Sequence, residues 1–287
     1  MVSIKPATTC KEQIEKLRSR GCTIAEESEA IQILSRVNYY RFTAYFLPFR
    51  KPDGSYIKGT NFNTVYRIYE FDRKMRHIIF SAIEEIEIYI RAIFAYHHAH
   101  TFGPLGYLDN KNFIQSHNHT EFMKKIGSEK ESRSRELFVK HHNSKYGGQF
   151  PIWVIIELFS FSTLSRFYID LPGSSQKYLA KTFYQSHQKD LSSWLYCCSV
   201  LRNICAHFGR LYFRKFTVIP NGIPDLDQTN NRSLFGALMA LKSLYIDTPK
   251  WNKEVFSAIT NLTAEYSNDI QFKHIGFPTD WGTRLKK

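Results

Sequence analysis

From Val65 to about His98, apolar residues recur every three or four positions and form one continuous stripe. Its members are Ile68, Phe71, Met75, Ile78, Ala82, Ile86, Ile90 and Ile93. Steps of three and four residues bring side chains to one face of an α-helix. We therefore predict one long helix, ended near Gly103-Pro104, as the main element of the fold.

The rest of the chain shows the same helical periodicity. A strongly apolar segment begins at Pro151 and closes at Pro172-Gly173, and the proline suits the first turn of a helix. Further helices are expected over 174–186, from Asp190 to Phe213, and over about 233–246 and 251–267. Because strand-like alternation is scarce throughout, we predict an all-α fold.

Changes in composition divide the chain into three parts. Residues 1–60 are expected to form an N-terminal extension of short helices and turns, and residues 61–217 the helical core. The core contains a polar, basic helical insertion at about 117–146. Residues 218–287 are expected to form C-terminal helices and a tail.

Composition limits the class of protein. The chain carries 39 Lys and Arg against 26 Asp and Glu, a net charge of +13, which favours an anionic partner such as nucleic acid. No segment has the roughly 20 consecutive apolar residues of a membrane helix, and the N-terminus lacks the apolar region of a signal peptide. The five cysteines form no CxxC pair and are typical of reduced thiols. We expect a cytoplasmic protein with no membrane partner.

One helical segment brings ionisable residues into an apolar setting. If the helix continues to Phe213, Asn203, His207 and Arg210 share a face, and Arg202 lies beside it. This set suits metal-independent cleavage of RNA by attack of the 2′-hydroxyl on its own phosphate. Histidine transfers the proton, arginine stabilises the charge that develops on the phosphate, and asparagine orients one of them. Because each chain supplies one such histidine, a homodimer would complete an acid–base pair.

Other interpretations of these residues remain open. An Arg and a His five positions apart are more often an ordinary solvated pair on a helix surface. The chain is alternatively a non-catalytic protein that holds a structured small RNA, or a structural partner of another defence protein.

Several residues outside this segment are candidates for supporting roles. Glu87 and Arg91 on the long helix are candidates to hold Arg202 or His207, with Arg210 as a further support. The alternative for Glu87 and Arg91 is an ordinary ion pair on the helix surface. In the insertion, the residues expected to bind RNA phosphates are Lys124, Lys125, Arg133, Arg135, Lys140 and Lys145. The aromatic residues between Tyr39 and Phe46 are expected to pack in the core, with base stacking as the alternative. Histidine spacing does not match a zinc site, so we expect no metal and no cofactor.

Four segments carry a resemblance to a known family, in this order along the chain from about residue 5 to 215. They are Asn38-Tyr39-Tyr40-Arg41; Tyr69 to Arg76; Pro151-Ile152-Trp153 with Glu157 and Ser160 to Ser165; and Leu201-Arg202-Asn203 with Ala206-His207 and Arg210-Leu211-Tyr212. The chain resembles the abortive-infection (Abi) proteins of the AbiD/AbiF kind, a bacterial phage-defence family with a HEPN-type helical core.

The resemblance implies a HEPN-like bundle, a composite nuclease site in a homodimer, and RNA as substrate. Arg202, Asn203 and His207 match the HEPN nuclease motif, which implies a phage-defence or toxin-type endoribonuclease. Some similar proteins are associated with a small structured RNA. Two positions differ: Gly209 replaces a tyrosine found in HEPN toxins that a nucleotidyltransferase silences, and Phe213 interrupts an R-L-Y-N-R segment.

Overall fold

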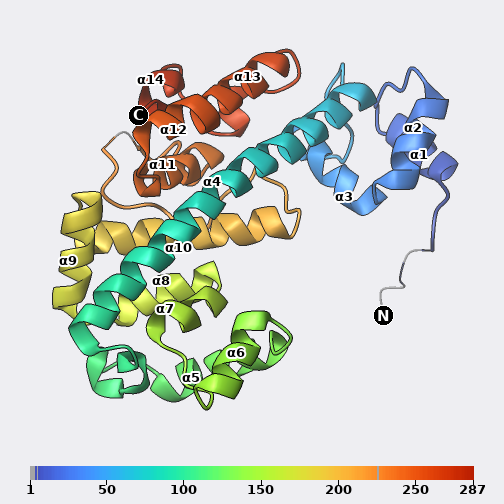
Figure 1. Cartoon of the computed structure of the whole chain (residues 1–287). Coiled ribbons are helices and arrows are strands. Elements are labelled where there is room, and N and C mark those ends of the chain that lie inside the picture. Colours follow the sequence, from blue (N-terminus) through green and yellow to red (C-terminus); the bar gives the residue numbers. More distant parts are fainter. Residues whose placement is uncertain (1–3, 5, 225) are drawn as a thin grey trace.

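The chain folds into α-helices joined by turns (Figure 1). The computed structural model describes residues 4, 6–224 and 226–287. The first residues of the predicted N-terminal extension, 1–3 and 5, and residue 225 of the loop after the core lie outside the described residues. Within these ranges no β-strand is present, and the β-like pairing amounts to two isolated bridges, Thr23 with Asn61 and Arg50 with Tyr56. The predicted all-α fold is confirmed.

The helices have the following bounds. The N-terminal part contains α1 (Cys10–Ser19), α2 (Glu27–Arg36), α3 (Tyr39–Thr43) and the 3₁₀ segment η1 (Ala44–Phe49). The middle contains α4 (Phe62–Phe102), α5 (His119–Ser132), α6 (Leu137–Lys145), α7 (Ile152–Ile155), η4 (Ile156–Leu158), α8 (Phe161–Asp170), α9 (Gly173–Tyr184) and α10 (Gln188–Ala206). The C-terminal part contains α11 (Leu234–Leu244), α12 (Thr248–Lys250), the π segment η5 (Trp251–Phe256), α13 (Ser257–Glu265) and α14 (Trp281–Leu285).

The long predicted helix is α4, and its ends have local causes. The Asn61 side chain accepts hydrogen bonds from the backbone N–H groups of Asn63 and Thr64, at 2.8 and 3.4 Å, and so caps the first turn. At the other end Gly103 has a φ of 82°, a conformation that glycine adopts without a steric penalty. The predicted apolar stripe is buried, except that Ile79 takes the fully buried place expected for Ile78.

The predicted apolar helix from Pro151 is divided in two. After α7 and η4 the backbone becomes extended at Phe159, and Ser160 begins a new helix, α8. The Ser160 hydroxyl accepts a hydrogen bond from the N–H of Thr163 at 3.3 Å, which makes it an N-cap. Such side-chain capping competes with a continuous helix.

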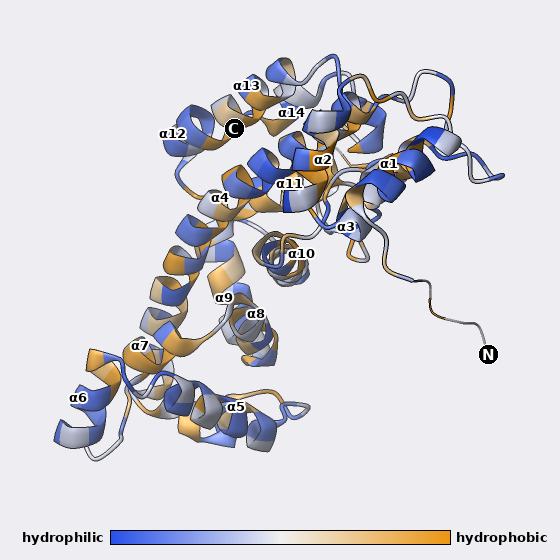
Figure 2. Ribbon diagram, turned by 90° about the vertical axis from the view of Figure 1, so that its right-hand side faces the viewer, coloured by the Kyte–Doolittle hydropathy of each residue, from blue (hydrophilic) through white to orange (hydrophobic). Residues whose placement is uncertain are grey.

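Helix α4 runs diagonally through the molecule, and the other helices are arranged along it (Figure 1). The N-terminal helices α1–α3 lie at its beginning, and the pair α5 and α6 lies at its opposite end. Between them α10 crosses α4 and packs against α8, α9 and α11. Figure 2 views α10 end-on, with α3 and α8 on either side of it.

One hydrophobic core connects all three predicted parts of the chain. It includes, for example, Ile14 of the N-terminal extension, Ile90 of α4 and Ile259 of α13, each fully buried. The basic segment at about 117–146 contains the helices α5 and α6. None of the described helices combines the length and apolar character that a membrane crossing requires.

Candidate functional site

The end of α10 carries the predicted catalytic residues. Arg202 and Asn203 lie in its last turn, and the helix ends at Ala206 with His207 as its C-cap. Phe208 then adopts a φ of 56°, and its N–H donates to the Cys205 carbonyl at 3.1 Å. The N–H of Gly209 donates to the Ile204 carbonyl at 2.7 Å. These two bonds form a Schellman motif, which ends the helix sharply.

The position after the helix end is strained. A left-handed conformation costs an L-residue about 1–2 kcal/mol, and glycine usually occupies it. Here Phe208, a residue that is 65% exposed, occupies it. Phe213, at the end of the same loop, also has a positive φ, of 53°. Strain of this kind gathers at functional sites because the surrounding structure must hold it in place.

A buried carboxylate holds this loop. Asp72 of α4 is fully buried and accepts hydrogen bonds from the backbone N–H groups of Leu211 and Tyr212, at 2.9 and 2.7 Å. It also accepts from the Tyr45 hydroxyl at 2.8 Å and from Arg76 at 2.7 Å. Burial raises the pKa of the Asp72 carboxyl, and the charge of Arg76 and the hydrogen-bond donors oppose that effect.

Two arginines hold the first part of the loop. The Arg76 guanidinium also donates to the carbonyl of Gly209, at 3.2 Å. Arg41 of α3 donates to the carbonyl of Phe208. The loop after His207 is therefore fixed by α3 and α4, two elements far away in the sequence.

Each predicted catalytic side chain has different surroundings. The Arg202 guanidinium lies over the ring of Phe80, with Cζ 5.9 Å from the ring centre, and its buried Nε has no hydrogen-bond partner in the described structure. Asn203 is exposed and donates to the Ser162 hydroxyl of α8 at 3.4 Å. His207 is exposed, and among the described residues no group is hydrogen-bonded to its ring.

The structure thus places the three residues on one helix end without linking them. In the described ranges no hydrogen bond joins the side chains of Arg202, Asn203 and His207. Arg202 is directed to α4 and Asn203 to α8. The imidazole and the guanidinium are both without an ionic partner among the described residues, and the imidazole is exposed to solvent.

The predicted place of Arg210 is wrong. The sequence predicts that α10 continues to Phe213, but the helix ends at Ala206, so Arg210 does not share a helical face with His207. Its guanidinium instead donates to the carbonyls of Tyr212 and of Phe213, the latter at 2.9 Å. Burial lowers the pKa of Arg210, but an arginine keeps its charge in proteins.

Glu87 and Arg91 do not support the site as predicted. They form an ion pair of 2.6 Å with each other, and Arg91 also donates to the Phe159 carbonyl at 2.8 Å. This contact holds the break between η4 and α8. In the described structure no hydrogen bond or ion pair joins either residue to Arg202 or His207.

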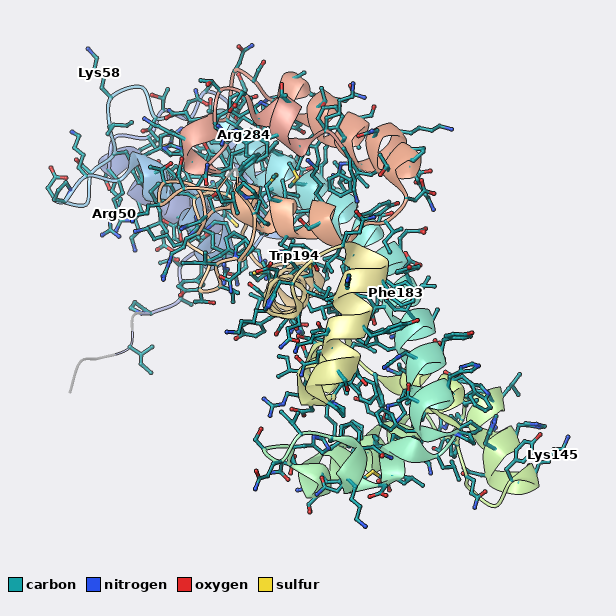
Figure 3. The ribbon with its side chains drawn as sticks, turned by 90° about the vertical axis from the view of Figure 1, so that its left-hand side faces the viewer. Arg50, Lys58, Lys145, Phe183, Trp194 and Arg284 are labelled. Atoms are coloured by element: carbon teal, nitrogen blue, oxygen red, sulfur yellow. The ribbon has the colours of Figure 1, made fainter. Side chains whose placement is uncertain are left out.

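The basic insertion is a separate surface. Lys124, Lys125, Arg135, Lys140 and Lys145 are exposed on or between α5 and α6. Arg133 is half-buried, donates to the Glu157 carbonyl at 3.2 Å and lies 3.6 Å from the Glu129 carboxylate. Figure 3 shows Lys145 at the opposite end of the molecule from Arg50 of the N-terminal part.

Sequence reasoning missed the buried pair of Asp72 and Arg76 and the contact of Arg41. The sequence did offer one signal: an Asp and an Arg four residues apart, directly beside the apolar stripe of α4. This pair also lies in the segment from Tyr69 to Arg76 that carries the family resemblance. Its loop partners lie about 140 positions away in the sequence, so no local pattern identifies them.

The structure also accounts for the glycine two positions after His207. A Cβ added at Gly209 would lie 2.9 Å from Ile204 Cγ2 and 3.0 Å from the Ile204 carbonyl oxygen. Both distances are closer than ordinary van der Waals contacts. A larger side chain at position 209 therefore requires Ile204 or the loop to shift.

The described side chains near the site do not suit thiol catalysis or metal binding. Burial raises the pKa of the Cys205 thiol to about 12, far above the range of a reactive thiolate. Among the described residues, no three His, Cys, Asp or Glu side chains gather closely enough to hold a metal ion.

Comparison with known proteins gives one positive result. Neither the curated proteins nor the solved structures that were compared contain a match to the chain. A family model described as Abi-like protein matches residues 32–213. This range covers well over half of the chain and includes α3, α4, α10 and the loop that follows it. The chain therefore belongs to the Abi-like protein family.

Proposed function

We propose that the chain is a metal-independent endoribonuclease of abortive infection and that it cleaves RNA at the end of α10. Membership in the Abi-like family suggests abortive-infection defence against phage. The nuclease activity, a HEPN-like site and RNA as substrate are our proposal for how that defence works.

One observation carries the proposal. The His207 imidazole is exposed and has no hydrogen bond to another described residue, and it follows the last helical turn, which presents the half-buried Arg202 guanidinium. Imidazole is the side chain that accepts and donates protons near neutral pH. Guanidinium binds phosphate oxygens in a bidentate manner. The buried pair of Asp72 and Arg76 fixes the loop, as a preorganised site requires.

The reaction follows from these groups. His207 removes the proton of an RNA 2′-hydroxyl, and the freed oxygen attacks the adjacent phosphorus. Negative charge grows on the phosphate oxygens, and Arg202 stabilises it. The bond to the 5′-oxygen breaks as that oxygen takes up a proton. The products are a 2′,3′-cyclic phosphate and a 5′-hydroxyl, and DNA, which lacks the 2′-hydroxyl, is not cleaved.

The second proton transfer requires a second acid. We propose that His207 of a second copy supplies it in a homodimer, since the described structure provides no further imidazole in contact with the end of α10. In this arrangement one active site needs both copies of His207, so a dimer of one parent chain and one His207→Ala chain is expected to be as inactive as the His207→Ala homodimer. An excess of His207→Ala chains mixed with the parent is therefore expected to lower the cleavage rate below that of the same amount of parent alone.

The test is cleavage of mixed cellular RNA by the purified protein in EDTA. The parent is expected to produce fragments that end in 2′,3′-cyclic phosphate. His207→Ala is expected to lose about 10²–10⁴-fold in rate, the usual contribution of general acid–base catalysis. His141→Ala, which removes an exposed imidazole of α6, is the matched control and keeps the parent rate. Equal rates for the parent and His207→Ala would refute the proposal.

A second candidate function is RNA binding without catalysis, as in a protein that holds a structured small RNA. The observation that favours it is that Asn203 is bonded to Ser162 rather than to His207, so the three motif residues are not assembled within one chain. This function predicts no cleavage product, binding that survives His207→Ala, and affinity that falls steeply with salt.

A further inference from the structure

A large cavity lies beside the end of α10, in the N-terminal part of the chain. It has a volume of about 650 Å³ and lies between α1, α3, η1 and the turn that follows η1. Its lining includes Arg20 after α1, Tyr39 and Arg41 of α3, Arg50 after η1, and Arg210 from the loop after His207. Cavities of this size hold ligands of nucleotide dimensions.

The charge of this cavity has one sign. Five cationic side chains line it, and none of the described lining residues is acidic; the five are Lys16, Arg20, Arg41, Arg50 and Arg210. In the described ranges none of them forms an ion pair. Arg18, on the same helix as Lys16, differs in this respect, because it pairs with Glu15 and Glu27 at 2.7 and 2.6 Å. A cluster of positive charges without ion pairs attracts an anion.

Aromatic groups accompany the cations. The Tyr40 side chain is 88% exposed at the rim of the cavity, although most aromatic residues of this segment are buried as predicted. The hydroxyl of Tyr39, another lining residue, is buried and has no hydrogen-bond partner in the described structure. A free ring suits base stacking, and a buried hydroxyl without a partner suits a bond to a ligand.

The cavity is joined to the candidate catalytic loop. Arg41 lines the cavity and donates to the carbonyl of Phe208, the residue that follows His207. Arg210 also lines it and holds the carbonyls of Tyr212 and Phe213. The basic insertion, in contrast, lies at the far end of the molecule (Figure 3).

We propose that this cavity binds one nucleotide of a single-stranded RNA, adjacent to the phosphate that the 2′-hydroxyl attacks once His207 has removed its proton. Arg20 and Arg50 bind its phosphate, and Tyr40 stacks on its base. This inference rests on the proposed function for the identity of the polymer, whereas the binding itself does not require cleavage.

The test measures binding separately from catalysis. A labelled single-stranded RNA is titrated with the full chain carrying His207→Ala, in EDTA, and its fluorescence anisotropy is followed. The double substitution Arg20→Gln with Arg50→Gln is expected to weaken binding at least tenfold. Because neutralising one phosphate contributes about 0.7 to the salt slope for a single strand, and both arginines bind the same phosphate, the slope is expected to fall by about 0.7.

Two further variants separate stacking from general charge. Tyr40→Ala is expected to weaken binding about 5- to 150-fold, the range for the loss of one stacked base. Arg18→Gln removes a positive charge that is already paired on α1 and is expected to leave binding within twofold of the parent. Far-UV circular dichroism melting of each variant verifies that the chain remains folded.

Three outcomes overturn the proposal. One is an unchanged affinity for RNA in the double variant of Arg20 and Arg50. Another is a loss of affinity as large as that of the double variant in Arg18→Gln, or in the insertion variant Lys140→Gln with Lys145→Gln. The third is competition by AMP at the same concentration as the RNA, which would assign the cavity to a free nucleotide. If RNA binds as predicted but the parent protein does not cleave it, the proposed nuclease activity is refuted and the proposed RNA-binding cavity is still supported.

Discussion

The buried pair of Asp72 and Arg76 is predicted to be energetically coupled, and a double-mutant cycle measures that coupling. Asp72→Asn keeps the shape of the side chain but replaces one acceptor oxygen by an amide. In one orientation that amide faces the donors Tyr45 and Arg76, and in the other it faces the N–H of Tyr212. In either orientation the amide N–H groups of the new Asn face other hydrogen-bond donors, and the Arg76 charge has no ionic partner.

The magnitude follows from burial. The Arg76 and Asp72 side chains are 6% and 0% exposed, so solvent screens the pair very little. Removing one partner of such a pair costs about 3–5 kcal/mol, because the other charge remains buried and uncompensated. Asp72→Asn and Arg76→Gln are each expected to lower the free energy of unfolding by about this amount. The double variant is expected to lose about 2–3 kcal/mol less than the sum, since it leaves no unpaired charge.

The assay is urea unfolding followed by far-UV circular dichroism. Arg73→Gln is the matched control: Arg73 lies on the same helix and pairs with Glu70, but it is 42% exposed. Its loss is expected to cost no more than about 1 kcal/mol. Hydrogen exchange of the loop 208–213 in Asp72→Asn is expected to increase at least tenfold. Additive effects of Asp72→Asn and Arg76→Gln, within about 0.5 kcal/mol, would refute the coupling.

Three further predictions concern stability near the site and in the core. Burial, and secondly the neighbouring His97, lower the pKa of His98 to about 4, and both of its ring nitrogens lack partners in the described structure. Because the unfolded chain binds this proton near pH 6.5, acid titration from pH 6.5 to 4 is expected to cost about 3 kcal/mol through this group. His98→Leu is expected to remove that component, and an identical pH dependence in this variant would contradict the assignment. Gly209→Ala is expected to lower the free energy of unfolding by about 1–3 kcal/mol, because its Cβ crowds Ile204; urea unfolding with a parental midpoint would show that the loop adjusts freely. Phe208→Gly relieves the left-handed strain of an exposed residue and is expected to raise the thermal midpoint by an amount equivalent to about 1 kcal/mol, whereas a lowered midpoint would indicate that the ring contributes packing.

The sequence predicts the helices well where periodicity decides the structure. The stripe of α4 is buried along most of its length because each of its residues follows a simple geometric rule. Prediction fails where a single residue changes the backbone path. Ser160 caps a new helix inside an apolar run, and Phe208 ends α10 in a conformation that glycine usually adopts. Apolar spacing continues across both breaks, so periodicity alone does not reveal them.

The candidate site is predicted in part for the same reason. Arg202, Asn203 and His207 lie at one helix end because their order along α10 is local information. The predicted role of Arg210 required α10 to continue through residues 207–210, which are not helical. Asp72 was missed because its structural role depends on two features that the sequence does not show. One is its hydrogen bonds to the N–H groups of a loop far along the chain, and the other is its burial.

Attack by the 2′-hydroxyl under the control of His207 is the central claim, and one substrate tests it most directly. An RNA oligonucleotide whose cleaved bond has been mapped is compared with the same oligonucleotide carrying a single 2′-deoxynucleotide on the 5′ side of that bond. In EDTA, the parent protein is predicted to cut the first and leave that bond of the second intact, and His207→Ala to cut neither. Equal cleavage of both oligonucleotides by the parent would contradict the proposed reaction.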